Sequence, residues 1–234
     1  MSTPSFPPLF SGLAVEGVID PFDKACVEAA RGCDAGLVVY NLGANALCAA
    51  LVLAPDVCLG DAMAMVPLCG VGFQNALGAL APPEVAVHLD WSGGIRINGA
   101  SCGRLQVAAA GTDPDREPDW LVVGLELPLW PTSDDPGDTP DETALYAEGC
   151  ADVDAAELLE SWVKHTLVGI NRWDDEGVGP LHNDWRGLAH GVGEPVEMAG
   201  HSGVFLGVDE KFGMLVRDTE TTHLVPLTHL LEDI

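Results

Sequence analysis

Basic residues are scarce in this chain of 234 residues. Lysine and arginine together number 10, against 36 aspartates and glutamates, and the formal net charge is −26. A chain this acidic repels phosphate backbones and anionic membrane surfaces, which argues against nucleic acid and membranes as partners. It also repels ATP at long range, unless a local basic cluster offsets the field. Two interpretations of the charge stay open: a solvated surface, or a field that steers a cationic partner.

Paired cysteines and membrane-crossing runs are also missing. Seven cysteines are scattered along the chain without a C-x-x-C motif, so the sequence indicates neither a disulfide framework nor a zinc site. The histidines show no metal-ligand spacing. No apolar run reaches the ~20 residues that span a bilayer. The N-terminus lacks the basic and apolar regions of a signal peptide. We therefore expect a cytoplasmic protein.

Hydrophobic residues are plentiful, at 47%, which is enough for a packed core. Asp20 and Asp154 are typical N-cap residues, and Pro67 should kink a helix or end its first turn. Apolar periodicity and these signals predict helices at 21–31, 60–80 and 154–173. Apolar runs predict strands at 35–43, 46–55, 85–91 and 119–130. The segment 131–143, rich in proline and aspartate, is expected to be a mobile acidic surface loop.

The pattern changes after Gly191. Four short apolar segments separated by glycine, aspartate and charged turns follow within about 40 residues, which is typical of a small β barrel. We place the boundary near 189–193, giving a first domain at 1–190 and a small β domain at 191–234.

The most informative stretch is Val87–Val107, VHLDWSGGIRINGASCGRLQV. His88 and Asp90 alternate on a predicted strand, so their side chains point to the same face. Gly93 and Gly94 remove side chains where a ligand could lie against the backbone. A second strand leaves through Cys102 and Gly103.

This stretch resembles the biotin–protein ligases and the related lipoate–protein ligases, whose active-site strand K-W-P-N-D is followed by a G-R-K-x-x-G turn. Trp91 and Gly103 match those motifs. Two further stretches match in order. The segment 171–187 resembles F-x-x-E-G-x-x-P-x-x-x-x-W, and the C-terminal strands resemble the small barrel of the family. The matching positions there are Trp173, Glu176, Gly177, Pro180, Trp185, Pro195, Val196, Gly207, Asp209 and Gly213.

The resemblance implies an α+β fold of the class II aminoacyl-tRNA synthetase and biotin synthetase type, a mixed sheet flanked by helices with an SH3-like C-terminal barrel. It implies ATP with magnesium, biotin or lipoate as cofactors or substrates, and a biotinyl or lipoyl carrier protein as partner. It also allows a homodimer through the central sheet. The ligand-binding positions that it implies are Asn41, Gly43, Asn45, Trp91, Ser92, Gly93, Gly94, Gly103, Arg104 and Gly124.

The cations of that chemistry are absent from the matching positions. The arginine-rich loop of the family is reduced to Asn41–Asn45, which has no basic residue. The lysine of K-W-P-N-D aligns with Asp90, and the second lysine aligns near Ala100 or Ser101. Only Arg96 and Arg104 remain nearby as anion partners. The sequence therefore predicts that ATP-dependent adenylation is impaired or lost.

Three hypotheses follow. The first is a binding module that holds a small carboxylic acid, or a carrier-protein lysine that meets Asp90. The second is an active biotinyl, lipoyl or octanoyl ligase or transferase with substituted residues, in which Cys102 is the nucleophile and His88 its base. The third is a structural or interaction role, in which Trp91, Phe73 and Leu105 fill the pocket.

Overall fold

The chain is built on one large sheet and one small sheet. The computed structural model describes residues 3–131 and 141–232, so most of the acidic loop predicted at 131–143 lies outside the described residues. The large sheet has seven strands in the order β1-β2-β3-β7-β6-β5-β4, antiparallel except for the β1–β2 pair. Its strands are β1 Ser11–Ala14, β2 Leu37–Leu42, β3 Ala46–Leu53, β4 Val87–Leu89, β5 Gly94–Ile97, β6 Ala100–Ala109 and β7 Leu121–Pro128.

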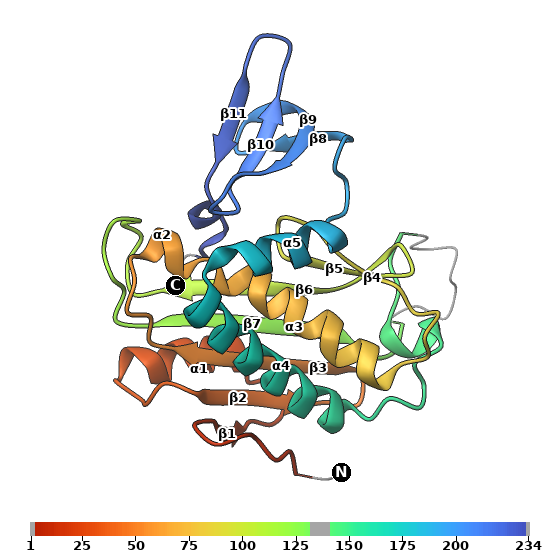
Figure 1. Cartoon of the computed structure of the whole chain (residues 1–234). Coiled ribbons are helices and arrows are strands. Elements are labelled where there is room, and N and C mark those ends of the chain that lie inside the picture. The colour runs from red at the N-terminus through yellow and green to blue at the C-terminus, as the bar shows by residue number, and fades with distance from the viewer. Residues whose placement is uncertain (1–2, 132–140, 233–234) are drawn as a thin grey trace.

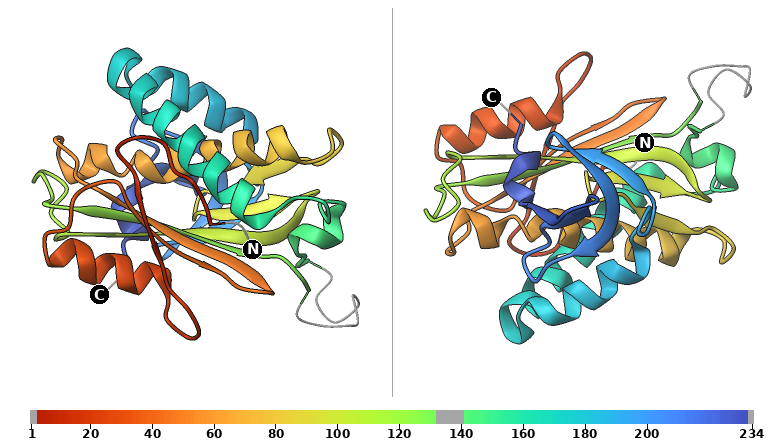
Figure 2. Two further views of the ribbon diagram at one scale, coloured as in Figure 1. Left: turned by 90° about the horizontal axis from the view of Figure 1, so that it is seen from below. Right: turned by 90° about the horizontal axis from the view of Figure 1, so that it is seen from above.

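Helices cover the two faces of this sheet unequally (Figures 1 and 2). α1 (Pro21–Ala30) packs on one face, against β2, β3 and β7. The other face carries α3 (Met65–Leu80), which packs on α4 (Ala155–Glu176) and α5 (Val178–Leu188). Because α1 is short, no helix of the described residues covers the first face over β5 and β4 and over part of β6 and β7. There are also two short 3₁₀ helices, η1 (Leu145–Glu148) before α4 and η2 (Leu227–Leu230) near the C-terminus.

Local sequence signals mark the starts of α1 and α4, as predicted. Asp20 accepts a hydrogen bond from the Phe22 amide at the start of α1, with Pro21 in the first turn. Asp154 accepts hydrogen bonds from two amides at the start of α4. The predicted helix 60–80 is divided into α2 (Leu59–Ala62) and α3, and Pro67 lies in the first turn of α3, where its missing N–H has no intrahelical partner to lose.

Asp61, Gln74 and Asn75 interrupt the apolar residues of Leu59–Leu80, so the expectation that no apolar run reaches ~20 residues holds for this segment. By length and composition alone, this segment of 22 residues could still cross a membrane, since the mean hydropathy of its apolar window is 1.4. Within the fold, 72% of the apolar window is buried. A core helix of a globular domain has the same length and composition, and α3 lies between the large sheet and α4.

The small sheet is an antiparallel meander in the order β11-β10-β9-β8. Its strands are β8 Pro195–Met198, β9 His201–Val208, β10 Met214–Arg217 and β11 Thr222–Val225. It stands at one end of the large domain, on the side of α2 and α5 (Figure 1). The β9–β10 loop is anchored below it, because the carbonyl of Phe212 accepts a 2.7 Å hydrogen bond from the buried Trp91 indole. The backbone of Leu231 and Glu232 pairs with Val107 of β6.

Candidate functional site

A cleft of about 530 Å³ lies on the face of the large sheet that α1 leaves uncovered. Four carboxylates line it, against a single guanidinium, that of Arg104. The carboxylates belong to Asp90, Glu126, Glu142 and Glu232. We call this cavity the open-face cleft. Strand alternation places its polar residues there, because Leu105 and Leu125 on the same strands point into the helix-covered core while Arg104 and Glu126 point away from it.

Asp90 is held by two basic side chains. The Arg96 Nε lies 2.9 Å from Oδ1 and 3.1 Å from Oδ2, and the His190 Nδ1 lies 3.1 Å from Oδ1. About three quarters of the Asp90 side chain is buried, since 24% remains exposed. The His190 partner was not predicted from the sequence. It reaches Asp90 because the backbone of Ala189 and His190 pairs with Leu89, one residue before Asp90.

The two arginines expected to serve as anion partners are both engaged. Arg96 binds Asp90, and its Nη1 donates to the carbonyl of Gly99 at 3.1 Å. Arg104 forms a 2.8 Å ion pair with Glu126, the residue directly opposite it on β7. The positive charge of each guanidinium is therefore already offset by a protein carboxylate, which reduces its attraction for a phosphate or a ligand carboxylate.

The glycines of the β4–β5 turn leave space that the protein itself fills. A Cβ on Gly93, whose φ is +92°, would lie 2.6 Å from the carbonyl oxygen of Leu105. A Cβ on Gly94 would lie 2.5 Å from the Asp90 carboxylate. A Cβ on Gly103 would lie 2.6 Å from the Glu126 carbonyl oxygen. These glycines allow tight strand contacts and room for the Asp90 side chain. Gly94, Gly103 and Ser92 also line the open-face cleft.

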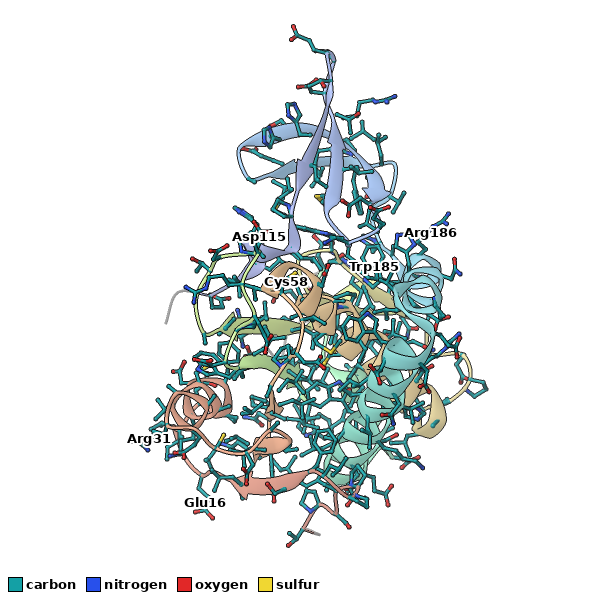
Figure 3. The ribbon with its side chains drawn as sticks, turned by 60° about the vertical axis from the view of Figure 1, so that its left-hand side comes forward. Glu16, Arg31, Cys58, Asp115, Trp185 and Arg186 are labelled. Atoms are coloured by element: carbon teal, nitrogen blue, oxygen red, sulfur yellow. The ribbon has the colours of Figure 1, made fainter. Side chains whose placement is uncertain are left out.

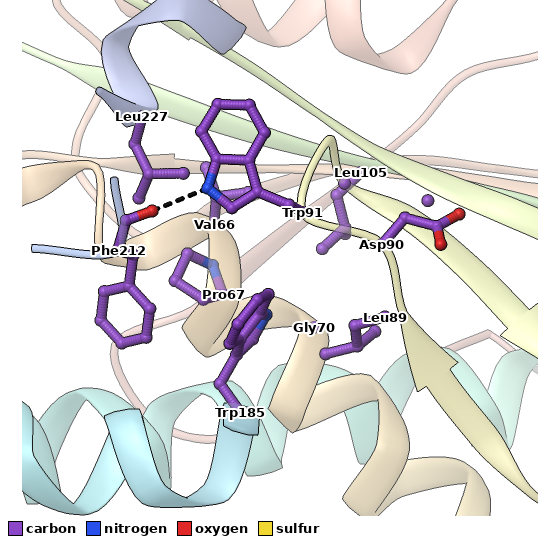
Figure 4. Close-up of a pocket in the computed structure, with 12 residues that line it drawn as sticks. Val66, Pro67, Gly70, Leu89, Asp90, Trp91, Leu105, Trp185, Phe212 and Leu227 are labelled. Carbon is purple, nitrogen blue, oxygen red and sulfur yellow. Dashed lines mark hydrogen bonds between the residues drawn. The ribbon is translucent and has the colours of Figure 1, made fainter. Parts of the chain in front are cut away.

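Trp91 points away from the cleft and into the domain junction (Figure 4). The residue is only 4% exposed, and its neighbours include Trp185, Phe212 and Leu227. The space left beside it is about 10 Å³, near the minimum for one water molecule. Side chains therefore fill the space beside Trp91, as the third hypothesis required. The open-face cleft, on the other side of the sheet, is not filled in this way.

The proposed nucleophile and base do not form an activated pair. Cys102 is 3% exposed, and burial raises the pKa of its thiol to about 12. A reactive thiol needs the opposite, a lowered pKa. His88 lies on the same face as Asp90, opposite Arg96, but its buried Nδ1 has no hydrogen-bond partner among the described residues. Within the described part of the chain, no hydrogen bond joins His88 to Cys102.

The remaining predicted positions lie farther from Asp90. Asn41, Gly43 and Asn45 belong to the β2–β3 hairpin, where the Asn45 carbonyl accepts hydrogen bonds from Leu129 and Trp130. None of the three lines the open-face cleft. Gly124 lies beneath α1, since a Cβ there would be 2.7 Å from the Phe22 ring. The structure thus brings together Asp90, Ser92, Gly94, Cys102, Gly103 and Arg104 at the cleft and leaves the hairpin and Gly124 outside its lining.

Among the described residues, the side chains of the open-face cleft offer little positive charge to ATP. A triphosphate needs several free cations or donors, whereas the cleft offers carboxylates and one arginine already paired with Glu126. At an effective dielectric near 20, unit charges about 4 Å apart interact by about 4 kcal/mol. The loss of a lysine at the position of Asp90, which the resemblance implies, would forfeit an attraction of about that size, and Arg96 offsets the charge of Asp90 itself.

The mixed sheet flanked by helices defines the catalytic fold of biotin protein ligases, and the antiparallel four-stranded sheet is consistent with their small C-terminal barrel. The sequence profile described as the Biotin/lipoate A/B protein ligase family matches residues 6–187. The chain belongs to this family. A second profile, a domain of unknown function called DUF4444, matches residues 192–233. No curated protein sequence matches the chain.

Solved structures agree with that assignment. A biotin protein ligase-like protein of unknown function from Silicibacter sp. TM1040 is 67% identical, with a TM-score of 0.94, and the match covers 99% of this chain and 100% of that one. Biotin protein ligase from Aquifex aeolicus is 16% identical, with a TM-score of 0.74 and coverage of 93% and 96%. Biotin protein ligase from Leishmania major in complex with biotinyl-5-AMP is 14% identical, with a TM-score of 0.59 and coverage of 94% and 99%. The two distant matches show the fold.

Proposed function

We propose that this protein is a binding module on a ligase scaffold, which receives a lysine side chain of a biotinyl or lipoyl carrier protein without adenylating an acid. The observation that carries the proposal is the excess of carboxylates in the open-face cleft, where Asp90, Glu126, Glu142 and Glu232 face a single arginine. Asp90 stands where the resemblance places a lysine, but Arg96 and His190 already contact it, so Glu142 and Glu232 supply the unpaired negative charge among the described residues. Cytoplasmic localisation and a homodimer remain predictions from the sequence.

The charge of the open-face cleft favours a cation over a carboxylic acid. Glu142 and Glu232 line it without an ion-pair partner among the described residues. An ammonium group entering the cleft meets these carboxylates, whereas an acid meets repulsion. The net charge of −26 adds a field that accelerates the approach of a basic surface.

The alternative of an active acyl ligase or transferase receives no support from Cys102. Its thiol is buried and carries a raised pKa. An acyl transfer through it would require a thiolate that this environment disfavours.

The test measures binding of two apo carrier domains, one biotinyl and one lipoyl, each with its acceptor lysine and with that lysine replaced by glutamine. We expect the lysine forms to bind more tightly, and Asp90→Lys to abolish the difference. Asp115→Lys makes the same charge change on an exposed loop (Asp115 is labelled in Figure 3) and should change binding little.

Glu142→Lys provides a second variant that breaks no ion pair among the described residues, in case Asp90→Lys perturbs folding. It should weaken binding of the lysine forms by about five- to tenfold, the effect of a partly screened charge reversal. Equal binding of the lysine and glutamine carrier domains by the wild-type protein would reject the proposal.

A further inference from the structure

A second large cavity lies where the small sheet meets the helices. Its volume is about 580 Å³, and it shares no lining residue with the open-face cleft. Its walls come from the segment 56–64 around α2, from the turn between α4 and α5, and from the β9–β10 loop. Figure 3 shows Cys58 of the first wall just below the small sheet. We call this space the junction cavity.

The walls of the junction cavity are held by specific bonds. Lys211 Nζ forms a 2.7 Å ion pair with Asp61, which ties the β9–β10 loop to α2. Within that loop, the Asp209 Oδ1 accepts hydrogen bonds from the amides of Lys211 and Gly213 at 2.9 and 2.7 Å. Phe212 adopts a φ of +61° and is 1% exposed, with its carbonyl bonded to Trp91. The cavity is therefore a feature of packed, hydrogen-bonded elements.

The lining combines apolar walls with negative charge. Val57, Trp173 and Val178 are partly exposed and supply apolar and aromatic surface, while Phe212 is buried behind it. Four carboxylates also line the space, from Asp56, Asp61, Asp174 and Glu210. Lys211 is the one basic residue among the lining side chains, and it is bonded to Asp61. The other three carboxylates have no ion-pair partner among the described residues.

These features define the chemistry of a ligand. The volume falls within the range of about 300–1,000 Å³ of small-molecule sites, which favour domain junctions and apolar walls with a few polar groups. An anion would face three unpaired carboxylates. A cation gains from these carboxylates, and its apolar stem gains from contact with the Trp173 side chain. A matching ligand therefore carries an ammonium or guanidinium group on an apolar stem.

We propose that the junction cavity binds an organic cation of this kind, through the carboxylates of Asp174 and Glu210 and the apolar surface of Trp173 and Val178. The proposal is independent of the function assigned to the open-face cleft, because the two cavities lie in different places and share no residue. A free amine and a lysine side chain of a peptide offer the same chemistry.

The experiment uses the full chain, labelled with ¹⁵N, and follows the indole N–H signal of Trp173, assigned with Trp173→Phe. The probes are phenylbutylamine, its neutral counterpart phenylbutanol, and an end-capped peptide containing one lysine between glycines. All titrations are made at low ionic strength, where exposed charges are least screened. We expect the amine to shift the Trp173 signal in a saturable way, and the alcohol to bind at least about fivefold more weakly.

Variants then locate the site. Asp174→Asn and Glu210→Gln should each weaken amine binding by about two- to fivefold, as expected for an exposed carboxylate, and together by about tenfold. Asp175→Asn is the matched control, because Asp175 does not line the cavity. Asp90→Asn, in the open-face cleft, should leave the Trp173 response unchanged.

Tighter binding of the peptide than of the amine would identify a protein segment as the source of the cation, and the reverse would identify a small molecule. The proposal is overturned if neither charged probe shifts the Trp173 signal, or if the alcohol binds as tightly as the amine. It is also overturned if the double variant stays within twofold of the wild type, or if Asp90→Asn abolishes the response.

Discussion

Replacing Trp91 by phenylalanine should detach the β9–β10 loop from the large domain. The indole Nε1 donates a 2.7 Å hydrogen bond to the Phe212 carbonyl, and both residues are more than nine-tenths buried. Phenylalanine cannot donate this bond, so a buried carbonyl is left without a partner, which costs about 1–3 kcal/mol. The smaller ring also leaves a void in a region with almost no free space, which adds about 1 kcal/mol.

Urea unfolding followed by circular dichroism measures the loss. We expect Trp91→Phe to lower the free energy of unfolding by about 2–4 kcal/mol. Trp130→Phe is the control, since Trp130 is 51% exposed, and its effect should stay within about 0.5 kcal/mol. Limited proteolysis of Trp91→Phe should also cut faster near Gly191–Gly193, where the two domains connect. A Trp91→Phe variant as stable as Trp130→Phe would refute this account of the junction.

Three further predictions concern single side chains. Because burial raises the pKa of Cys102 to about 12, iodoacetamide at neutral pH should leave Cys102 unmodified in the native protein and label it in urea, as read by mass spectrometry; rapid native labelling would contradict the buried thiol. The hydrogen bond from Lys211 lowers the pKa of Asp61. The ion pair therefore stabilises the folded state at a pH above the ordinary aspartate pKa, and this stabilisation is lost as the pH falls through the lowered pKa. Thermal denaturation should therefore find Asp61→Asn less stable than wild type by about 0.2–1 kcal/mol at neutral pH and equal to it in strong acid, whereas a pH-independent difference would argue against the ion pair. Asp154→Ala removes two N-cap hydrogen bonds from α4 and should lower the free energy of unfolding by about 1 kcal/mol, while an unchanged value would show that the cap is unimportant.

The sequence predicted the elements with strong local signals. N-cap aspartates and apolar periodicity located α1, α3 and α4, and the four short C-terminal strands follow the predicted segments. No helix was predicted at α5, whose first turn contains Gly179 and Pro180, two residues that disfavour helix interiors. Pro180 lies in the first turn of α5, where it is tolerated, so the helix forms and positions Trp185 at the junction.

The candidate site was predicted only in part. Alternation along the strand correctly put His88 and Asp90 on one face, but Trp91 packs in the core and Gly124 lies under α1. His190 was missed because it lies 100 residues from Asp90, and only the pairing of Ala189 with Leu89 brings it near. The engagement of Arg96 by Asp90 depends on cross-strand geometry, which composition and spacing do not specify.

Calorimetric titration with biotin, lipoate and octanoate, each with and without ATP and magnesium, tests the central claim most directly. The claim is that the open-face cleft, lined by four carboxylates and a paired arginine, cannot support adenylation. We expect no acid to gain affinity from ATP. Tight binding of one acid only when ATP and magnesium are present would contradict the account.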